Sequence, residues 1–129
     1  MTKEEHINHW LKSADEDMKD IIVLYEANRF MKALYFGHLY IEKICKALWV
    51  KNNVENIAPF THNLTKLLNG IETGLSSDDM DFLIELNKYQ TKGRYPEFIE
   101  NLELDTTKEL TAEFINRIKI IDQCLRKKL

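Results

Sequence analysis

The fold of this chain is constrained most by the stretch Ala33–Lys51, ALYFGHLYIEKICKALWVK. Gly37 is its only helix-weakening residue, and a helix tolerates one glycine at a cost of about 1 kcal/mol relative to alanine. When the stretch is wound as a helix, its apolar side chains cover roughly half of the circumference. An arc this wide requires packed neighbours on several sides. The stretch therefore predicts the central helix of an α-helical bundle.

The remaining face of this helix is mixed. His38, Glu42 and Lys46 follow one another at steps of four, with Tyr35 and Trp49 beside them. Residues four apart are neighbours on a helix, and a Glu-to-Lys pair at this spacing contributes only about 0.2–0.5 kcal/mol. The simplest interpretation of Glu42 and Lys46 is a solvated ion pair.

Length and composition indicate a single domain over residues 1–129. A chain of 129 residues buries enough surface to fold without a metal or a disulfide. Its net charge is −3, which argues against general nucleic-acid binding because that function usually needs a basic surface. Cys45 and Cys124 have no CxxC spacing, so we expect two buried thiols in a reducing compartment.

No segment of the sequence indicates a membrane or an export signal. The first ten residues, MTKEEHINHW, lack the apolar core of a signal peptide. No apolar run reaches the roughly 18 residues that a membrane span requires. We expect a cytoplasmic protein that makes no membrane contact.

Two long helices form an expected hairpin at the start of the chain. Thr2 and Glu5 have the spacing of a capping box, so the first helix is expected over residues 3–27. A two-residue break precedes the central helix, which is expected over residues 30–53. A connection this short makes the two helices antiparallel neighbours.

Three further helices are expected after a loop that contains Pro59. Thr61 is the expected cap of a short helix over residues 62–71, and Ser76 begins a capping box ahead of residues 78–90. The last helix is expected to start at a third capping box, at Thr106, and to run almost to the end. No strand pattern is present, so the sequence predicts an all-α, up-and-down bundle of four or five helices.

Asp17 does not fit the polar face of the first helix. On the helical wheel it falls inside or beside the apolar stripe. One interpretation is a partly exposed acid at the edge of the stripe. The other is a buried acid paired with a basic side chain from elsewhere in the bundle, because an unpaired buried charge is costly.

The segment TKGRYPEF, residues 91–98, is expected to be a loop because it contains Gly93 and Pro96. Arg94 lies beside the aromatic Tyr95. Such a loop suits binding of a phosphate or a base, and it equally suits a solvated turn with an anchoring tyrosine.

Recognisable catalytic and metal signatures are missing from the sequence. His6 and His9 have chelating spacing, but no further ligand completes a zinc pattern. No GxSxG, Cys–His or glycine-rich phosphate motif occurs. Asp17 and Glu42 suit acid–base chemistry if the helices bring them together, but acids are common in helical bundles. We expect no metal and no cofactor.

Four segments form a familiar pattern. The first helix has an early Trp and then Ala-x-x-Asp-hydrophobic, at Ala14–Met18, and the central helix has Glu-Lys-x-x-Lys-Ala-Leu, at Glu42–Leu48. Thr-His-x-Leu-x-x-Leu-Leu follows at Thr61–Leu68, and Tyr-x-x-x-x-Arg-Tyr-Pro at Tyr89–Pro96. Over residues 10–97 the chain thus resembles the HEPN domains (higher eukaryote and prokaryote nucleotide-binding), in the branch with the Arg-Tyr-Pro signature.

The resemblance implies a helical bundle that is usually a homodimer. It also implies a nucleotide-binding module, which in many members is the partner of a minimal nucleotidyltransferase in a toxin–antitoxin-type or substrate-binding pair. A ribonuclease branch of the family carries an Arg, four to six residues and then a His. No His lies in that range after Arg94. We therefore expect a non-catalytic protein, with an atypical ribonuclease toxin as the alternative, in which Arg94, His62 and Tyr95 form a rearranged site.

The resemblance also suggests a binding site. If the first two helices and the loop of Arg94 meet, Asp17 has a partner in Arg94 or in Lys46. Together with Glu42, His62 and Tyr95 these residues are the expected ligand-binding site. The alternative is structural, with Arg94 and Tyr95 clamping the loop onto the bundle.

For a dimer, the mixed face of the central helix is the expected interface. Aromatic side chains interleaved with charges suit a surface shared with a second subunit. We expect Tyr35, His38 and Trp49 to lie there.

Overall fold

Helix α2 (Phe30–Asn52) lies at the centre of the computed structural model, as its apolar arc predicts. Thirteen of its residues are buried, more than in any other helix. The structure describes residues 1–129 as helices joined by loops, with no strand. The other elements are α1 (Lys3–Glu26), α3 (Leu64–Leu68), α4 (Ser77–Thr91), the 3₁₀ turn η1 (Lys92–Arg94), α5 (Pro96–Asp105) and α6 (Lys108–Arg126).

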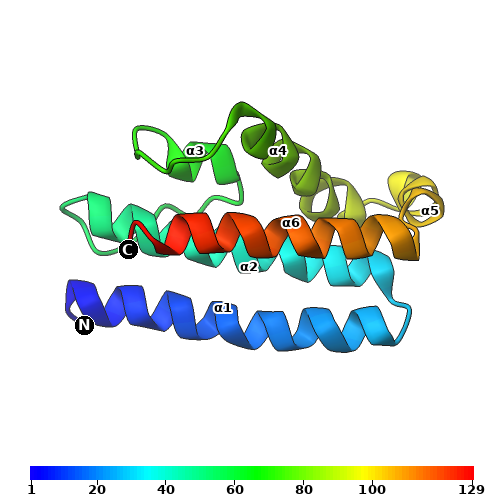
Figure 1. Cartoon of the computed structure of the whole chain (residues 1–129), viewed down its shortest axis with the longest axis horizontal. Helices are drawn as coiled ribbons and strands as arrows, with labels where there is room; N and C mark the ends of the chain where they lie inside the picture. The colour runs from blue at the N-terminus through cyan, green and yellow to red at the C-terminus, as the bar shows by residue number, and fades with distance from the viewer.

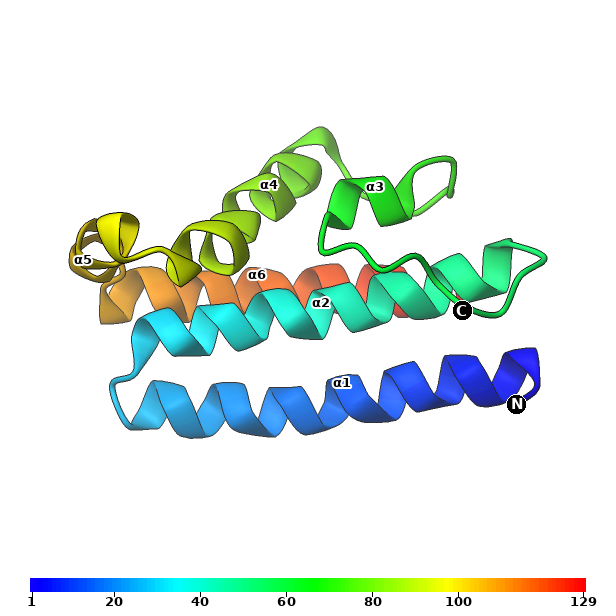
Figure 2. The same cartoon turned by 180° about the vertical axis from the view of Figure 1, so that it is seen from behind.

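The remaining helices pack around α2. Helix α1 runs antiparallel to α2 along its whole length, α6 covers a second side, and α3 and α4 cover a third (Figures 1 and 2). Helix α5 lies at the end of the molecule where α2 begins, and both chain termini lie at the opposite end. Seen from behind, one side of α2 has no helix over it (Figure 2). The predicted all-α bundle is confirmed, with six α-helices.

Helices α2 and α6 approach each other closely at Gly37. A Cβ atom built at this position would lie 2.8 Å from Cδ1 of Ile118, closer than real Cβ contacts. Glycine at this position thus leaves room for the end of the Ile118 side chain, which would have to move to admit a Cβ atom. Gly37 lowers the helix propensity of α2 but allows α2 and α6 to pack more closely.

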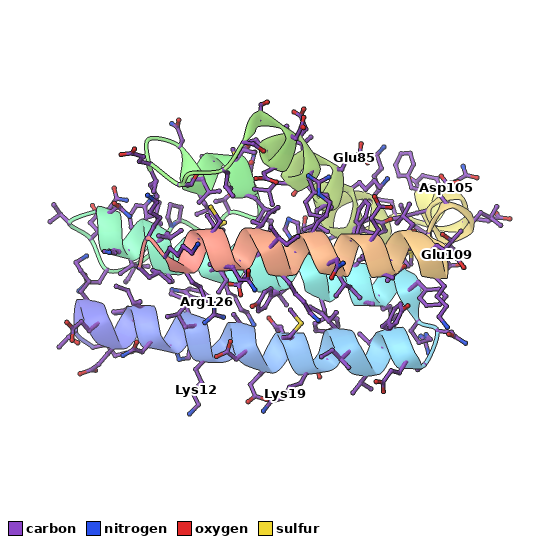
Figure 3. All side chains as sticks on the ribbon, in the orientation of Figure 1. Lys12, Lys19, Glu85, Asp105, Glu109 and Arg126 are labelled. Atoms are coloured by element: carbon purple, nitrogen blue, oxygen red, sulfur yellow. The ribbon has the colours of Figure 1, made fainter.

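A polar network also joins α2 to α6 and α1. The Tyr40 hydroxyl donates to Oδ2 of Asp122 at 2.7 Å, and Nε of Arg126 donates to Oδ1 of the same carboxylate at 2.7 Å. Arg126 also pairs with Asp15 of α1 at 2.7 Å; Figure 3 shows it between α6 and α1. Burial, together with the Asp122 carboxylate, raises the pKa of Tyr40 to about 12.

The observed N-caps agree with the predicted ones at two helices and differ at two others. Thr2 accepts from the backbone of α1, and Ser76 forms the full capping box of α4, as predicted. The predicted cap of α3 is wrong, because Asn63 rather than Thr61 accepts from the first turn. The predicted cap of α6 is also wrong, because Thr107 caps the helix. Thr106 is buried instead and bonds to the Tyr89 hydroxyl at 3.0 Å.

Helix α5 was not expected from the sequence. Pro96 indicated a loop, but it occupies the first turn of α5, where its missing N–H costs nothing and its fixed φ suits a helix. None of the helices combines the length and the apolar character needed to cross a membrane.

Candidate functional site

A groove of about 330 Å³ lies where the first turns of α2 meet α4 and η1. Aromatic and aliphatic side chains form much of its wall, and Lys32 and Arg94 supply two cations. The full lining is Met31, Lys32, Tyr35, Phe36, Tyr89, Gly93 and Arg94. Tyr35 keeps 37% of its surface exposed there. The groove thus offers positive charge beside aromatic surface.

The two cations of this groove are not used by the chain itself. Neither Lys32 nor Arg94 belongs to an ion pair. The hydrogen bonds from arginine side chains come from Arg117 and Arg126 alone. The structural alternative, in which Arg94 clamps its loop onto the bundle, therefore has no ion pair or hydrogen bond to carry it.

Tyr95 precedes α5 and does not line the groove. Its side chain is 53% exposed, and the residue stands at the N-cap of α5 in an extended conformation. Nearby, Lys92 Nζ lies 5.8 Å from the ring centroid of Phe98. Exposed cations and aromatic rings therefore gather at this end of the molecule.

A second, smaller pocket of about 230 Å³ opens at the start of α2. It shares Met31 and Lys32 with the groove and adds Arg29 as a third cation. Glu103 of α5 is the only acidic residue that lines either pocket. Arg29 forms no ion pair with it or with any other acid.

Glu42 lies at the centre of a separate polar cluster. Its Oε1 lies 2.8 Å from Nδ1 of His62, and its Oε2 lies 3.2 Å from Nζ of Lys46. Glu42 and Lys46 are both buried, and the lysine ammonium stacks over the Trp10 ring of α1. The interpretation of this pair as solvated is therefore wrong, because Trp10 and the loop that carries His62 cover it.

His38 belongs to the same cluster and is a core residue. It has no exposed surface, its Nε2 lies 3.0 Å from Oδ1 of Asn87, and its Nδ1 has no hydrogen-bond partner. Burial lowers the pKa of His38, against the opposing effects of the Glu42 charge and the Asn87 hydrogen bond. The prediction that His38 lies at a dimer interface is wrong for this fold, since a fully covered side chain offers no contact area.

Asp17 is buried and paired, as the second of its two interpretations requires. Its Oδ2 lies 2.7 Å from Nζ of Lys43. The expected partners, Arg94 and Lys46, are wrong, because Lys43 is the cation of α2 that faces α1 at this level. Asp17 and Lys43 thus form a buried ion pair within the chain, as Glu42 and Lys46 do.

The predicted site residues thus do not meet at one place, since Asp17 pairs with Lys43 and Tyr95 stands outside the groove. Arg94 and Tyr35 lie at the groove, whereas His62 lies with Glu42 in the middle of α2. Since a helix rises 1.5 Å per residue, Lys32 and Glu42 are about 15 Å apart along the axis. Lys32 and Arg29 were missed. Lys32 could have been identified from its spacing, because it lies three residues before Tyr35 and therefore on the same helix face.

Other reactive groups do not extend either site. Cys45 is fully buried, and burial raises the pKa of its thiol well above its ordinary value. No group of three His, Cys, Asp or Glu side chains is arranged to hold a metal ion.

Comparison with known proteins gives one result. The chain has no significant match among curated proteins or among solved structures. The family model of the HEPN domain matches residues 7–128, which is nearly the whole chain. Together with the all-helical bundle around α2, this match shows that the chain belongs to the HEPN domain family.

Proposed function

We propose that this protein is a non-catalytic HEPN module that binds a nucleotide in the groove of Lys32, Tyr35 and Arg94. The observation that carries the proposal is the exposed Arg94 guanidinium, which lines the groove and makes no ion pair or hydrogen bond within the chain. Arginine binds phosphate through paired hydrogen bonds, and aromatic side chains such as Tyr35 stack on bases. Positive charge beside an aromatic ring therefore suits a phosphate attached to a base.

The size and polarity of the groove support a small ligand. Its volume of about 330 Å³ lies at the lower end of the roughly 300–1,000 Å³ of small-molecule sites. Its lining mixes four hydrophobic residues with two cations, which matches the usual pattern of apolar walls and a few placed polar groups.

The experiment is calorimetric titration of the purified protein with adenosine monophosphate, in wild type and in Arg94→Ala. We expect measurable binding that falls about tenfold in Arg94→Ala, because one charge-assisted contact is lost. Lys12→Ala is the matched control, since Lys12 points from α1 away from the bundle (Figure 3) and should leave affinity unchanged. Absence of binding, or equal binding by Arg94→Ala, would refute the proposal.

The ribonuclease alternative is not favoured by the positions of its residues. A general base and a phosphate-binding cation must act on one phosphodiester, whereas His62 bonds to Glu42 about 15 Å along α2 from Lys32 of the groove. Incubation with total cellular RNA distinguishes the two functions. We expect intact RNA; cleavage that Arg94→Ala abolishes would instead establish the enzyme.

We further propose a homodimer that forms across the uncovered side of α2. Tyr35 and the half-buried Trp49 remain the interface candidates on α2. Sedimentation of a 15.3 kDa chain is expected to give a species of twice that mass. Tyr35→Glu and Trp49→Glu should each give a monomer with the helical circular dichroism unchanged, and a dimer that survives both places the interface elsewhere. Tyr35→Glu should also weaken nucleotide binding because Tyr35 lines the groove, so Trp49→Glu is the variant that tests the dimer alone.

The partner that we propose for this module is a minimal nucleotidyltransferase. Co-expression with a candidate encoded next to this chain tests it, and we expect both proteins to elute together in size-exclusion chromatography. Separate elution at micromolar concentrations would contradict the partnership and leave the nucleotide titration unaffected.

A further inference from the structure

A groove of about 560 Å³ lies between α4 and α6 and shares no residue with the groove of Lys32, Tyr35 and Arg94. It exists because both helices pack against α2 but hardly against each other. Figure 1 shows that α4 runs obliquely to α6 rather than along it. Five of the lining residues come from α4 and three from α6. We call this feature the α4–α6 groove.

The floor of the α4–α6 groove is apolar and consists of Phe82, Leu110 and Phe114. Phe82 and Phe114 stack edge to face, with their ring centroids 4.9 Å apart. Leu110 and Phe114 lie one turn apart on α6, and both are only half-buried. The floor therefore presents apolar surface that no element of the chain covers completely.

The wall that α4 contributes is acidic. Asp78, Asp81 and Glu85 follow one another at steps of three and four, which places them on one face of the helix, and all three are exposed. Glu85 pairs with Lys88 at 3.1 Å. Neither Asp78 nor Asp81 belongs to an ion pair. Two carboxylates of this wall are therefore uncompensated.

The cation that α6 contributes, Arg117, is already used by the chain. Its Nη2 lies 3.6 Å from Oδ1 of Asp79, and its guanidinium carbon lies 4.4 Å from the ring centroid of Phe82. The net uncompensated charge of the groove is thus negative. Arg117 also covers the Phe82 ring, so this ring is not open to stack with a small organic cation.

We infer that the α4–α6 groove binds a basic amphipathic helix of another protein. The apolar face of that helix covers Leu110 and Phe114, and lysine or arginine side chains on its flank face Asp78 and Asp81. Charge complementarity of this kind sets the partner and its orientation. The inference goes beyond the proposed nucleotide binding and does not depend on it.

A helix fits this groove better than an extended peptide does. The groove lies between two helices and offers no sheet edge, so an extended backbone finds no ladder of hydrogen-bond partners, whereas a helix satisfies its own backbone groups. From Asp78 to Glu85 the acidic wall covers about 10 Å of α4, or two turns of a bound helix. The same acids repel a nucleic-acid strand.

The test is fluorescence anisotropy at 150 mM NaCl with a labelled 14-residue peptide that carries leucine on one helical face and lysine on the rest. A peptide with glutamate in place of lysine is the second probe. We expect micromolar binding of the lysine peptide and none of the glutamate peptide. Asp81→Lys should weaken binding about tenfold, because repulsion replaces attraction. Leu110→Gln should weaken it several-fold, because the floor loses apolar surface.

The matched control is Asp20→Lys, which makes the same charge change at an exposed acid of α1 that belongs to no ion pair. It should leave the affinity unchanged, and circular dichroism should show all three variants folded. Equal losses in Asp20→Lys and Asp81→Lys would reduce the binding to net charge and refute the groove. Unchanged affinity in Leu110→Gln, or no binding of the lysine peptide, would also refute it.

A second copy of the chain is the other occupant that the test must separate. The homodimer proposed above uses the uncovered side of α2, which leaves the α4–α6 groove free. We expect sedimentation to show no species heavier than a dimer. A heavier species that Asp81→Lys abolishes would assign the groove to a second copy and overturn the inference of a different protein.

Discussion

Nδ1 of His62 lies 2.8 Å from Oε1 of Glu42, which joins the loop ahead of α3 to the buried middle of α2. The carboxylate is almost fully covered, whereas the imidazole is half exposed. His62 donates this hydrogen bond, because an ionised carboxylate has only acceptors. The bond therefore fixes the path of a loop that has little other secondary structure, and it also supplies one of the partners that a buried carboxylate requires.

His62→Ala is expected to lower the free energy of unfolding by about 1 kcal/mol. A hydrogen bond to a charged group contributes about 1.5–3 kcal/mol, and partial exposure of the imidazole reduces that value. Urea unfolding followed by circular dichroism measures the change. His6→Ala is the matched control, since the His6 side chain makes no hydrogen bond or ion pair within the chain. If both variants lose the same stability, the Glu42 bond is not the cause.

The buried His38 should make stability depend on pH. Burial holds the pKa of His38 below 6.5 in the folded chain, whereas the unfolded chain keeps the ordinary value of 6.5. At a pH between the folded and the unfolded pKa, the unfolded chain therefore binds more protons. Stability from this residue is complete above about pH 6.5 and falls as the pH is lowered toward the folded pKa.

The variant His38→Gln isolates this effect, because glutamine can still donate to Asn87 but does not titrate. Chemical unfolding at intervals from pH 7.5 to pH 5 gives the difference in unfolding free energy between wild type and variant. We expect the wild type to lose unfolding free energy relative to the variant as the pH falls. A difference that is constant across the range would show that His38 does not titrate differently on folding.

Gly37→Ala should destabilise the chain although alanine is the better helix former. The gain of about 1 kcal/mol in propensity is opposed by overpacking against Ile118, which typically costs about 1–3 kcal/mol. We expect a net loss of about 1 kcal/mol by urea unfolding.

The double variant Gly37→Ala with Ile118→Val tests the reason for that loss. Valine lacks the Cδ1 atom that lies 2.8 Å from the built Cβ. Ile118→Val alone costs about 0.5–1.5 kcal/mol, and the double variant should be less destabilised than the sum of the two single changes. If the losses of the two single variants simply add in the double variant, contact with Cδ1 of Ile118 is not the cause of the loss in Gly37→Ala.

Tyr40→Phe should cost about 2 kcal/mol of unfolding free energy. The change removes the hydroxyl that donates to the Asp122 carboxylate at 2.7 Å and leaves that acceptor one partner short. Thermal unfolding measures the loss. Tyr35→Phe is the control, because the Tyr35 hydroxyl makes no hydrogen bond within the chain, and its melting temperature should stay at the wild-type value.

The main features of the fold could be predicted because local signals and burial agree. Thr2 and Ser76 set helix starts through bonds within one turn, and the apolar arc of α2 placed it at the centre. Helix α5 was missed because Pro96 has two opposite meanings, a helix breaker or a first-turn residue, and its neighbours did not decide between them. The start of α6 moved by one residue because buried Thr106 bonds to Tyr89, a tertiary contact that no local pattern contains.

The candidate site was less predictable, because a helical wheel gives the direction of a side chain but not what covers it. Glu42 and His38 were expected on an open face, yet the loop that carries His62 and the side chain of Asn87 cover them. Asp17 required a cation, but Lys43 and Lys46 lie within one turn of each other on α2, and only packing selects Lys43. Arg94 was identified from the family pattern, whereas Lys32 and Arg29 required the path of η1 and α5.

The central position of α2 has a consequence for local opening and hydrogen exchange. Helices α1, α3, α4 and α6 all pack against α2, while α5 contacts it only slightly. Amides in the middle of α2 can therefore exchange only when the whole chain opens, whereas α5 can open alone. The proposed groove lies where α2, which opens only with the whole chain, meets η1, which leads into α5. A bound ligand should slow exchange in η1 and α5 while leaving the middle of α2 unchanged.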